Sequence, residues 1–171
     1  VTREISIDDL QQPVSPSRKV SLNLGVLRDL AVYTGGQRIG TMKLADWSTV
    51  NSGQELNAPT VDTLIVTGRK DVPGTEADES LPGNCSAILL LGDASTTAGT
   101  WSIRTIRVAG MVGDIQATGR VGNIVAGQIS GQLKATSFGT IMTRAVAGST
   151  VATGAITGDI EATGIPGVRT S

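Results

Sequence analysis

The chain has 171 residues, including 22 glycines but only two Trp, one Tyr and one Phe, and its formal net charge is -1. The low charge argues against a disordered chain and against a nucleic-acid-binding protein, which needs a surplus of Lys and Arg. The absence of histidine removes the commonest general base and metal ligand. The longest apolar run, Ala87 to Leu91, is too short to span a membrane.

The first region, residues 1–26, contains Pro13 and Pro16 and lacks the short repeat that fills the rest of the chain. We expect it to cap the first coil of a repeat structure or to form an extended arm. The chain begins at Val1 and shows no signal-peptide pattern, which indicates a mature or trimmed piece from which any export signal has been removed.

The second region, residues 27–102, carries a unit of a branched apolar residue (Met in one copy), any residue, and then Ala, Val, Leu or Thr. Apolar positions i and i+2 lie on one face of a β-strand. Polar, turn-rich stretches separate the units, and they are predicted to be loops that project from the wall of the repeat. The units are Leu30-Ala31-Val32, Met42-Lys43-Leu44 and Leu64-Ile65-Val66, and the stretches are 48–60, 68–86 and 92–100.

The third region, residues 103–164, repeats this unit about every nine residues. Glycines precede several of the anchoring residues by two positions and are predicted to turn the chain, because glycine accepts a positive φ. Residues 165–171 remain as a short tail. The anchors are Ile106, Ile115, Ile124, Leu133, Ile141, Val151 and Ile160, and the glycines are Gly113, Gly122, Gly131 and Gly158.

This pattern predicts an all-β fold, since helical periodicity would place apolar residues three and four apart. Each strand is too short to bury its own face, so successive coils must stack to form a core. We therefore predict a single-domain parallel β-helix (β-solenoid) over residues 1–171. Two nine-residue steps give a coil of 18 residues and three give a longer coil, and the sequence leaves both open.

The segment VGDIQATGRVGNIVAGQISGQLKATS (112–137) resembles the G-[DN]-I-x-A-x-G repeats of large bacterial surface and secreted proteins, notably of planctomycete type. It is similar, more loosely, to the core of bactofilins, which polymerise end to end. The resemblance covers residues 103–164. It implies a right-handed parallel β-helix at the cell surface or outside the cell, whereas a bactofilin-like role implies a cytoplasmic scaffold.

Few side chains suggest chemistry. The acidic loop with Asp71, Glu76, Asp78 and Glu79 is a candidate cation site, and a solvated insert is the ordinary interpretation of such a loop. The calcium-binding nine-residue β-roll has aspartates and paired glycines that this repeat lacks, so we expect no metal in the repeats and no cofactor. Trp47 and Trp101 lie at the edges of inserts and are candidates to stack on sugar rings, or alternatively to cover loop roots.

The sequence shows no catalytic constellation. Asp62 and Arg104 could meet on adjacent coils, but the spacing of three between Arg104 and Arg107 predicts opposite faces of a strand. We therefore expect a non-enzymatic protein whose role rests on its core anchors and turn glycines.

The short tail leaves the C-terminal coil without a substantial cap. This predicts a structural building block that stacks head to tail with copies of itself or with further repeats of a larger chain, residues 1–20 of one copy meeting the C-terminal coils of the next. The alternative function is a carbohydrate-binding or carbohydrate-processing module with a groove between inserts 48–60 and 68–86.

Overall fold

The computed structural model describes residues 19–48, 54–74, 78–93, 96–144 and 154–164, together with the backbone of residues 3–6. None of these residues lies in a helix, and every pair of named strands is parallel. The all-β prediction is therefore confirmed.

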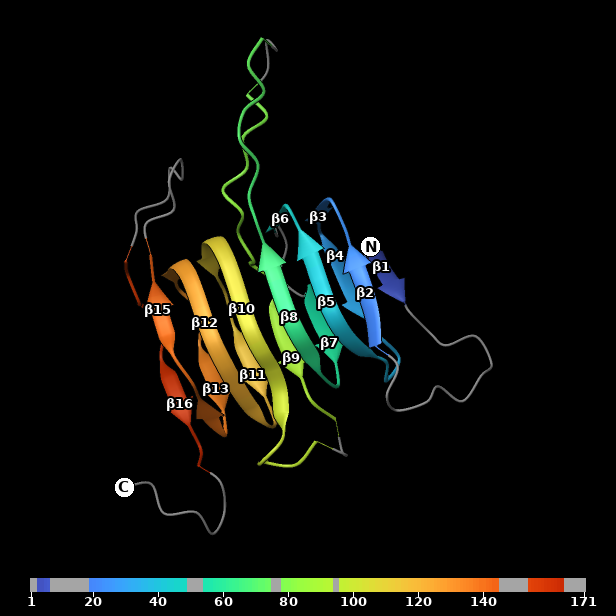
Figure 1. The fold of residues 1–171 in the computed structure, drawn as a ribbon, viewed down its shortest axis with the longest axis vertical. Coiled ribbons are helices and arrows are strands. Elements are labelled where there is room, and N and C mark those ends of the chain that lie inside the picture. The colour runs from blue at the N-terminus through green and yellow to red at the C-terminus, as the bar shows by residue number, and fades with distance from the viewer. Residues whose placement is uncertain are drawn as a thin grey trace.

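Two seven-stranded sheets form the two main layers of the molecule (Figure 1). Sheet A has the order β1-β4-β7-β9-β11-β13-β16, and sheet B has the order β2-β5-β8-β10-β12-β14, with β15 also paired to β12. A two-stranded sheet, β3-β6, forms a narrow third face. The strands of sheet A are β1 Arg3–Ser6, β4 Leu30–Tyr33, β7 Glu55–Ala58, β9 Ile88–Leu91, β11 Ile115–Ala117, β13 Leu133–Ala135 and β16 Ile160–Ala162. The strands of sheet B are β2 Lys19–Asn23, β5 Arg38–Leu44, β8 Val61–Val66, β10 Trp101–Val112, β12 Arg120–Ile129, β14 Ser137–Phe138 and β15 Ile141–Thr143, and those of the third face are β3 Val26–Arg28 and β6 Asp46–Ser48.

The chain runs repeatedly from sheet B over the third face to sheet A, as in the succession β5, β6, β7. Ile106 pairs with Ile124 in sheet B, and Ile115 pairs with Leu133 in sheet A. Both pairs join residues 18 positions apart, so the structure has two nine-residue steps per repeat at this point. Such an arrangement of parallel sheets is compatible with a β-solenoid.

The core consists of columns of apolar side chains at equivalent positions of neighbouring strands. The predicted anchors Ile106, Ile115, Ile124 and Leu133 are all fully buried in it. Side chains from the two sheets and the third face belong to one hydrophobic cluster. One column from each runs through Met42, Leu64, Ile106 and Ile124 in sheet B, Leu56, Leu89, Ile115 and Leu133 in sheet A, and Trp47, Cys85, Val112 and Ile129 on the third face.

Ile160 differs from these four fully buried anchors. It pairs with Leu133 and continues the sheet A column, yet it is 46% exposed. The reason is its place in the sheet, because among the described strands none lies beyond β16. Ile156, which extends the third-face column from Ile129, is exposed to the same degree. Val151 lies outside the described residues.

Three of the four predicted turn glycines, Gly122, Gly131 and Gly158, are required for a different reason from the one expected. None of Gly113, Gly122, Gly131 and Gly158 has a positive φ. An added Cβ on Gly131 would overlap the backbone of Gly113, and one on Gly158 would overlap the carbonyl of Gly131. The side chain is excluded because neighbouring strands approach closely at these positions, and the backbone conformation itself is ordinary.

The predicted inserts are only partly loops. Residues 55–58 of the stretch 48–60 form β7, whose Leu56 and Ala58 are buried. In the stretch 68–86, an antiparallel bridge joins Arg69 to Leu81 at the base of a segment that projects far beyond the sheets (Figure 1). The described part of 92–100 contains no strand.

Strand pairing begins earlier than the sequence indicated. Within residues 1–26, β1 pairs with β4 and β2 pairs with β5. This region therefore supplies one edge strand to each large sheet.

Candidate functional site

Of the two interpretations of Trp47, the one in which it stacks on a sugar ring is wrong. Its side chain is fully buried in the third-face column, and its indole Nε1 donates a hydrogen bond to the carbonyl of Leu30 at 3.1 Å. A ring in this position fills the core and offers no face to a sugar.

Two carboxylates of the acidic loop accept hydrogen bonds from backbone N–H groups of the same loop. Asp71 Oδ1 accepts a hydrogen bond from the backbone N–H of Glu79 at 3.0 Å, and Asp78 Oδ1 accepts one from Ser80 at 2.8 Å. The hydrogen bonds from Ser80 lower the pKa of the fully exposed Asp78 carboxyl. Glu76 lies outside the described residues. In the part of the chain that the structure describes, no group of three or more Cys, Asp or Glu residues is arranged to hold a metal ion.

Cys85 is a buried free cysteine that follows Trp47 in the third-face column. Desolvation by burial raises the pKa of this thiol to about 12. At neutral pH the side chain is therefore protonated and shielded from reagents, and it acts as a small apolar core residue.

Trp101 occupies a different environment from Trp47. It begins β10, is only partly buried, and pairs directly with Arg120 of β12. The Arg120 guanidinium lies 4.2 Å from the centroid of the indole ring, and that of Arg104 lies at 5.6 Å. Both distances are within the range of cation–π attraction, so the two arginines help to hold the ring in place.

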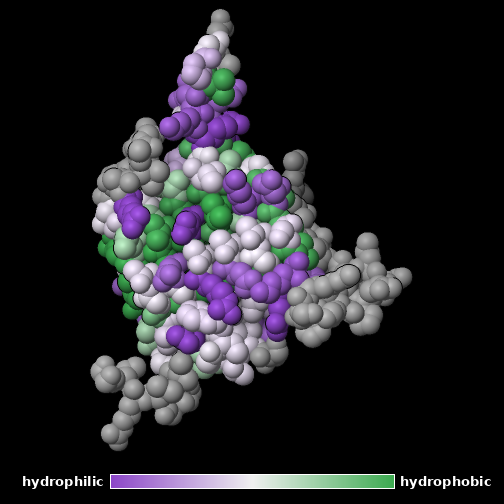
Figure 2. All heavy atoms as spheres, in the orientation of Figure 1, coloured by the Kyte–Doolittle hydropathy of each residue, from purple (hydrophilic) through white to green (hydrophobic). Residues whose placement is uncertain are grey.

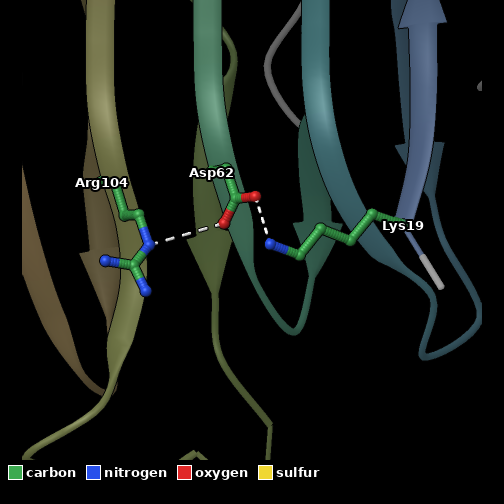
Figure 3. A network of polar contacts seen from close by, with 3 residues as sticks. All are labelled: Lys19, Asp62 and Arg104. Atoms are coloured by element: carbon green, nitrogen blue, oxygen red, sulfur yellow. Dashed lines mark hydrogen bonds and ion pairs between the residues drawn. The ribbon is translucent and has the colours of Figure 1, made fainter. Parts of the chain in front are cut away.

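Asp62 links three strands on the outer face of sheet B (Figure 3). Its carboxylate forms an ion pair with Lys19 of β2, and its Oδ1 lies 3.6 Å from Arg104 Nε of β10. β5 lies between β2 and β8, so the Lys19 side chain must cross it. It crosses at Gly40, where an added Cβ would lie 3.3 Å from Lys19 Cβ and crowd the passage.

These side chains border a pocket of about 400 Å³. Arg38 forms no ion pair with any other residue that the structure describes. Figure 2 shows hydrophilic side chains gathered in a band across this face of the molecule. The lining residues are Lys19, Arg38, Pro59, Thr60, Asp62, Thr96, Gly99, Thr100, Trp101 and Arg104.

Arg104 and Arg107 are both exposed, contrary to the alternation expected of a regular strand. Ile103 and Ile106 both face the core with two residues between them, so the inward and outward alternation is shifted by one position. Arg104 lines the pocket beside Trp101, and Arg107 lines a second hollow with Ile65 and Val125.

Sequence reasoning missed Lys19, Arg38 and Arg120. A signal for them exists, since each stands directly before the first apolar residue of a sheet B strand. Equivalent positions of neighbouring strands meet, as the pairing of Lys19 with Arg38 shows.

Comparison with protein families, curated proteins and solved structures gives no significant match to this chain. A search of the described residues finds no helix long and apolar enough to cross a membrane.

Proposed function

We propose that the chain is a right-handed parallel β-solenoid and a non-enzymatic structural building block, which stacks end to end with copies of itself in an assembly at the cell surface or outside the cell. Crossover connections between parallel strands are right-handed in nearly all proteins, which supports the handedness. The resemblance of residues 103–164 to repeats of bacterial surface proteins supports the location.

The observation that carries the proposal is the edge of sheet A at β16, beyond which no described strand lies. Ile160 is 46% exposed there although it continues a column of buried residues. The outer edge of a strand also presents unpaired N–H and C=O groups that accept another strand. Proteins usually avoid such an apolar edge, so its presence favours a partner strand.

The partner strand that fits is β1 of a second copy. All strands of sheet A run in the same direction, so β1 can continue the sheet beyond β16 as one more parallel strand. The register supports this pairing, because Ile5 of β1 stands opposite Val32 in the column that ends at Ile160. Seven strands at about 4.8 Å each predict an axial repeat of about 34 Å.

The test compares Ile160→Lys with Val72→Lys, using light scattering and negative-stain electron microscopy. Val72 is 45% exposed and lies on the projecting segment, so its substitution removes a similar apolar surface far from the edge. We expect Val72→Lys to assemble like the unchanged chain, with an axial repeat of about 34 Å, and Ile160→Lys to remain monomeric.

Deletion of residues 1–6 removes β1 from the opposite edge and should give the same loss of assembly. Assembly of the Ile160→Lys variant, or a monomeric unchanged chain at high concentration, would refute the proposal. A bactofilin-like scaffold would share the end-to-end contact but differ in location, so fractionation of the producing cells separates these two roles.

A further inference from the structure

We propose that the pocket beside Trp101, on the outer face of sheet B, binds an acidic oligosaccharide through one hexuronate unit. The proposal goes beyond the assembly role, because the pocket lies on the face of the sheet and not at β1 or β16. Its volume of about 400 Å³ falls in the range of small-molecule sites, which is roughly 300–1,000 Å³.

Trp101 supplies the platform for the sugar ring. Arg120 approaches the indole from β12, on one side of β10. The pocket residues Thr60 and Arg38 come from the opposite side of β10, from the start of β8 and from β5. The indole thus contacts Arg120 and also borders the pocket, where Arg104 lies 5.6 Å from the ring centroid. An indole is apolar and flat, and it packs well against the C–H groups of a pyranose.

Two arginines supply the charge for a carboxylate. Arg38 is exposed and has no ion-pair partner in the described part of the chain. The Arg104 side chain is 58% exposed, and its contact with Asp62 is long, at 3.6 Å. A guanidinium binds a carboxylate through two parallel N–H···O hydrogen bonds, which gives geometry as well as attraction.

The remaining polar groups suit sugar hydroxyls better than phosphates. Thr60 lines the pocket with a hydroxyl that can donate and accept hydrogen bonds, and the Thr100 hydroxyl, which donates to the Thr97 carbonyl at 2.7 Å, can accept one. The Asp62 carboxylate accepts hydrogen bonds from sugar hydroxyls, whereas a phosphodiester has no O–H group to donate to it. The net charge of -1 also provides no general attraction for a nucleic acid.

The test measures binding of oligogalacturonate by isothermal titration calorimetry and by tryptophan fluorescence. Trp47 is fully buried, so a fluorescence change on binding reports on Trp101. Arg38→Ala is compared with Lys43→Ala, since both remove one exposed positive charge from the outer face of β5 and only Arg38 lines the pocket. A neutral glucose oligosaccharide and a single-stranded oligothymidylate serve as competing ligand classes.

We expect Arg38→Ala and Trp101→Ala each to weaken oligogalacturonate binding about tenfold or more, and Lys43→Ala to leave it within about twofold. Circular dichroism verifies that each variant is folded. Equal losses in Arg38→Ala and Lys43→Ala would show a non-specific charge effect and overturn the proposal. It is also overturned if the unchanged chain does not bind at millimolar ligand, if the neutral oligosaccharide binds equally well, or if the oligothymidylate binds more tightly.

Discussion

Replacing Gly131 by alanine should destabilise the fold through a steric collision between neighbouring strands. The new Cβ would overlap the carbonyl carbon of Gly113 and the nitrogen of Asp114, and it would lie 2.5 Å from the Gly113 carbonyl oxygen. All three are backbone atoms, so no flexible side chain can move aside. Gly131 has no positive φ, and the cost is therefore one of space rather than of conformation.

The magnitude follows from two opposing effects. Alanine restricts the unfolded chain, which stabilises the native state by about 0.4–1 kcal/mol where the site tolerates it. Overpacking a close contact typically costs about 1–3 kcal/mol, and a backbone collision belongs at the upper end. We expect a net loss of about 2 kcal/mol in the free energy of unfolding. For a domain of this size that lowers Tm by about 4–8 °C.

Urea and thermal unfolding, followed by far-ultraviolet circular dichroism, would measure a graded series of three glycine substitutions. At Gly25 an added Cβ meets nothing within 4 Å, and at Gly113 the nearest atom is the Ser86 carbonyl oxygen at 3.3 Å. Neither position has a positive φ. Stability should fall in the order Gly25→Ala, Gly113→Ala, Gly131→Ala. Equal stability of Gly25→Ala and Gly131→Ala would refute the argument from close strand approach.

Three further predictions concern side chains. Trp47→Ala should lower the free energy of unfolding by about 3–5 kcal/mol, and Trp101→Ala by much less, because only Trp47 is fully buried; similar losses in urea unfolding would contradict this. Cys85 should resist alkylation at pH 8 until the chain is unfolded. Since burial raises its pKa in the folded state to about 12 from the ordinary value of 9.0, the unfolded chain loses this proton first and stability should fall as the pH rises from about 9 towards 12. A Cys85→Ala variant should show a flatter pH dependence in this range, and an equally steep one would refute the linkage. Asp62→Asn should cost less than about 1 kcal/mol, since its ion pairs are exposed, and 1 M salt should remove the difference; a larger, salt-independent loss would show that the contact acts by packing.

The sequence by itself was sufficient for the periodic part of the fold. Ile106, Ile115, Ile124 and Leu133 could be recognised as core anchors because apolar residues at i and i+2, repeated every nine residues, leave few other ways to bury them. Because the spacing is regular, assigning one copy of the repeat to a strand assigns the other copies as well. The same reasoning missed β7, where Pro59 and the surrounding polar residues concealed the unit Leu56-Asn57-Ala58.

Only the tertiary structure decided which strands became neighbours and, with that, which side chains met. Lys19, Arg38, Asp62 and Arg104 are separated by up to 85 positions in the chain, yet they border one pocket because sheet B stacks their strands. The inserts between strands vary in length, so the four residues are not spaced at a fixed period. Their sequence positions alone therefore do not predict that they lie close together. The degree of burial also depends on neighbouring strands: Leu133 and Ile160 hold equivalent positions, and among the described strands only Leu133 has a neighbour on both sides. In a regularly alternating strand the local sequence predicts which side chains point inward, whereas the stacking of strands determines what covers them.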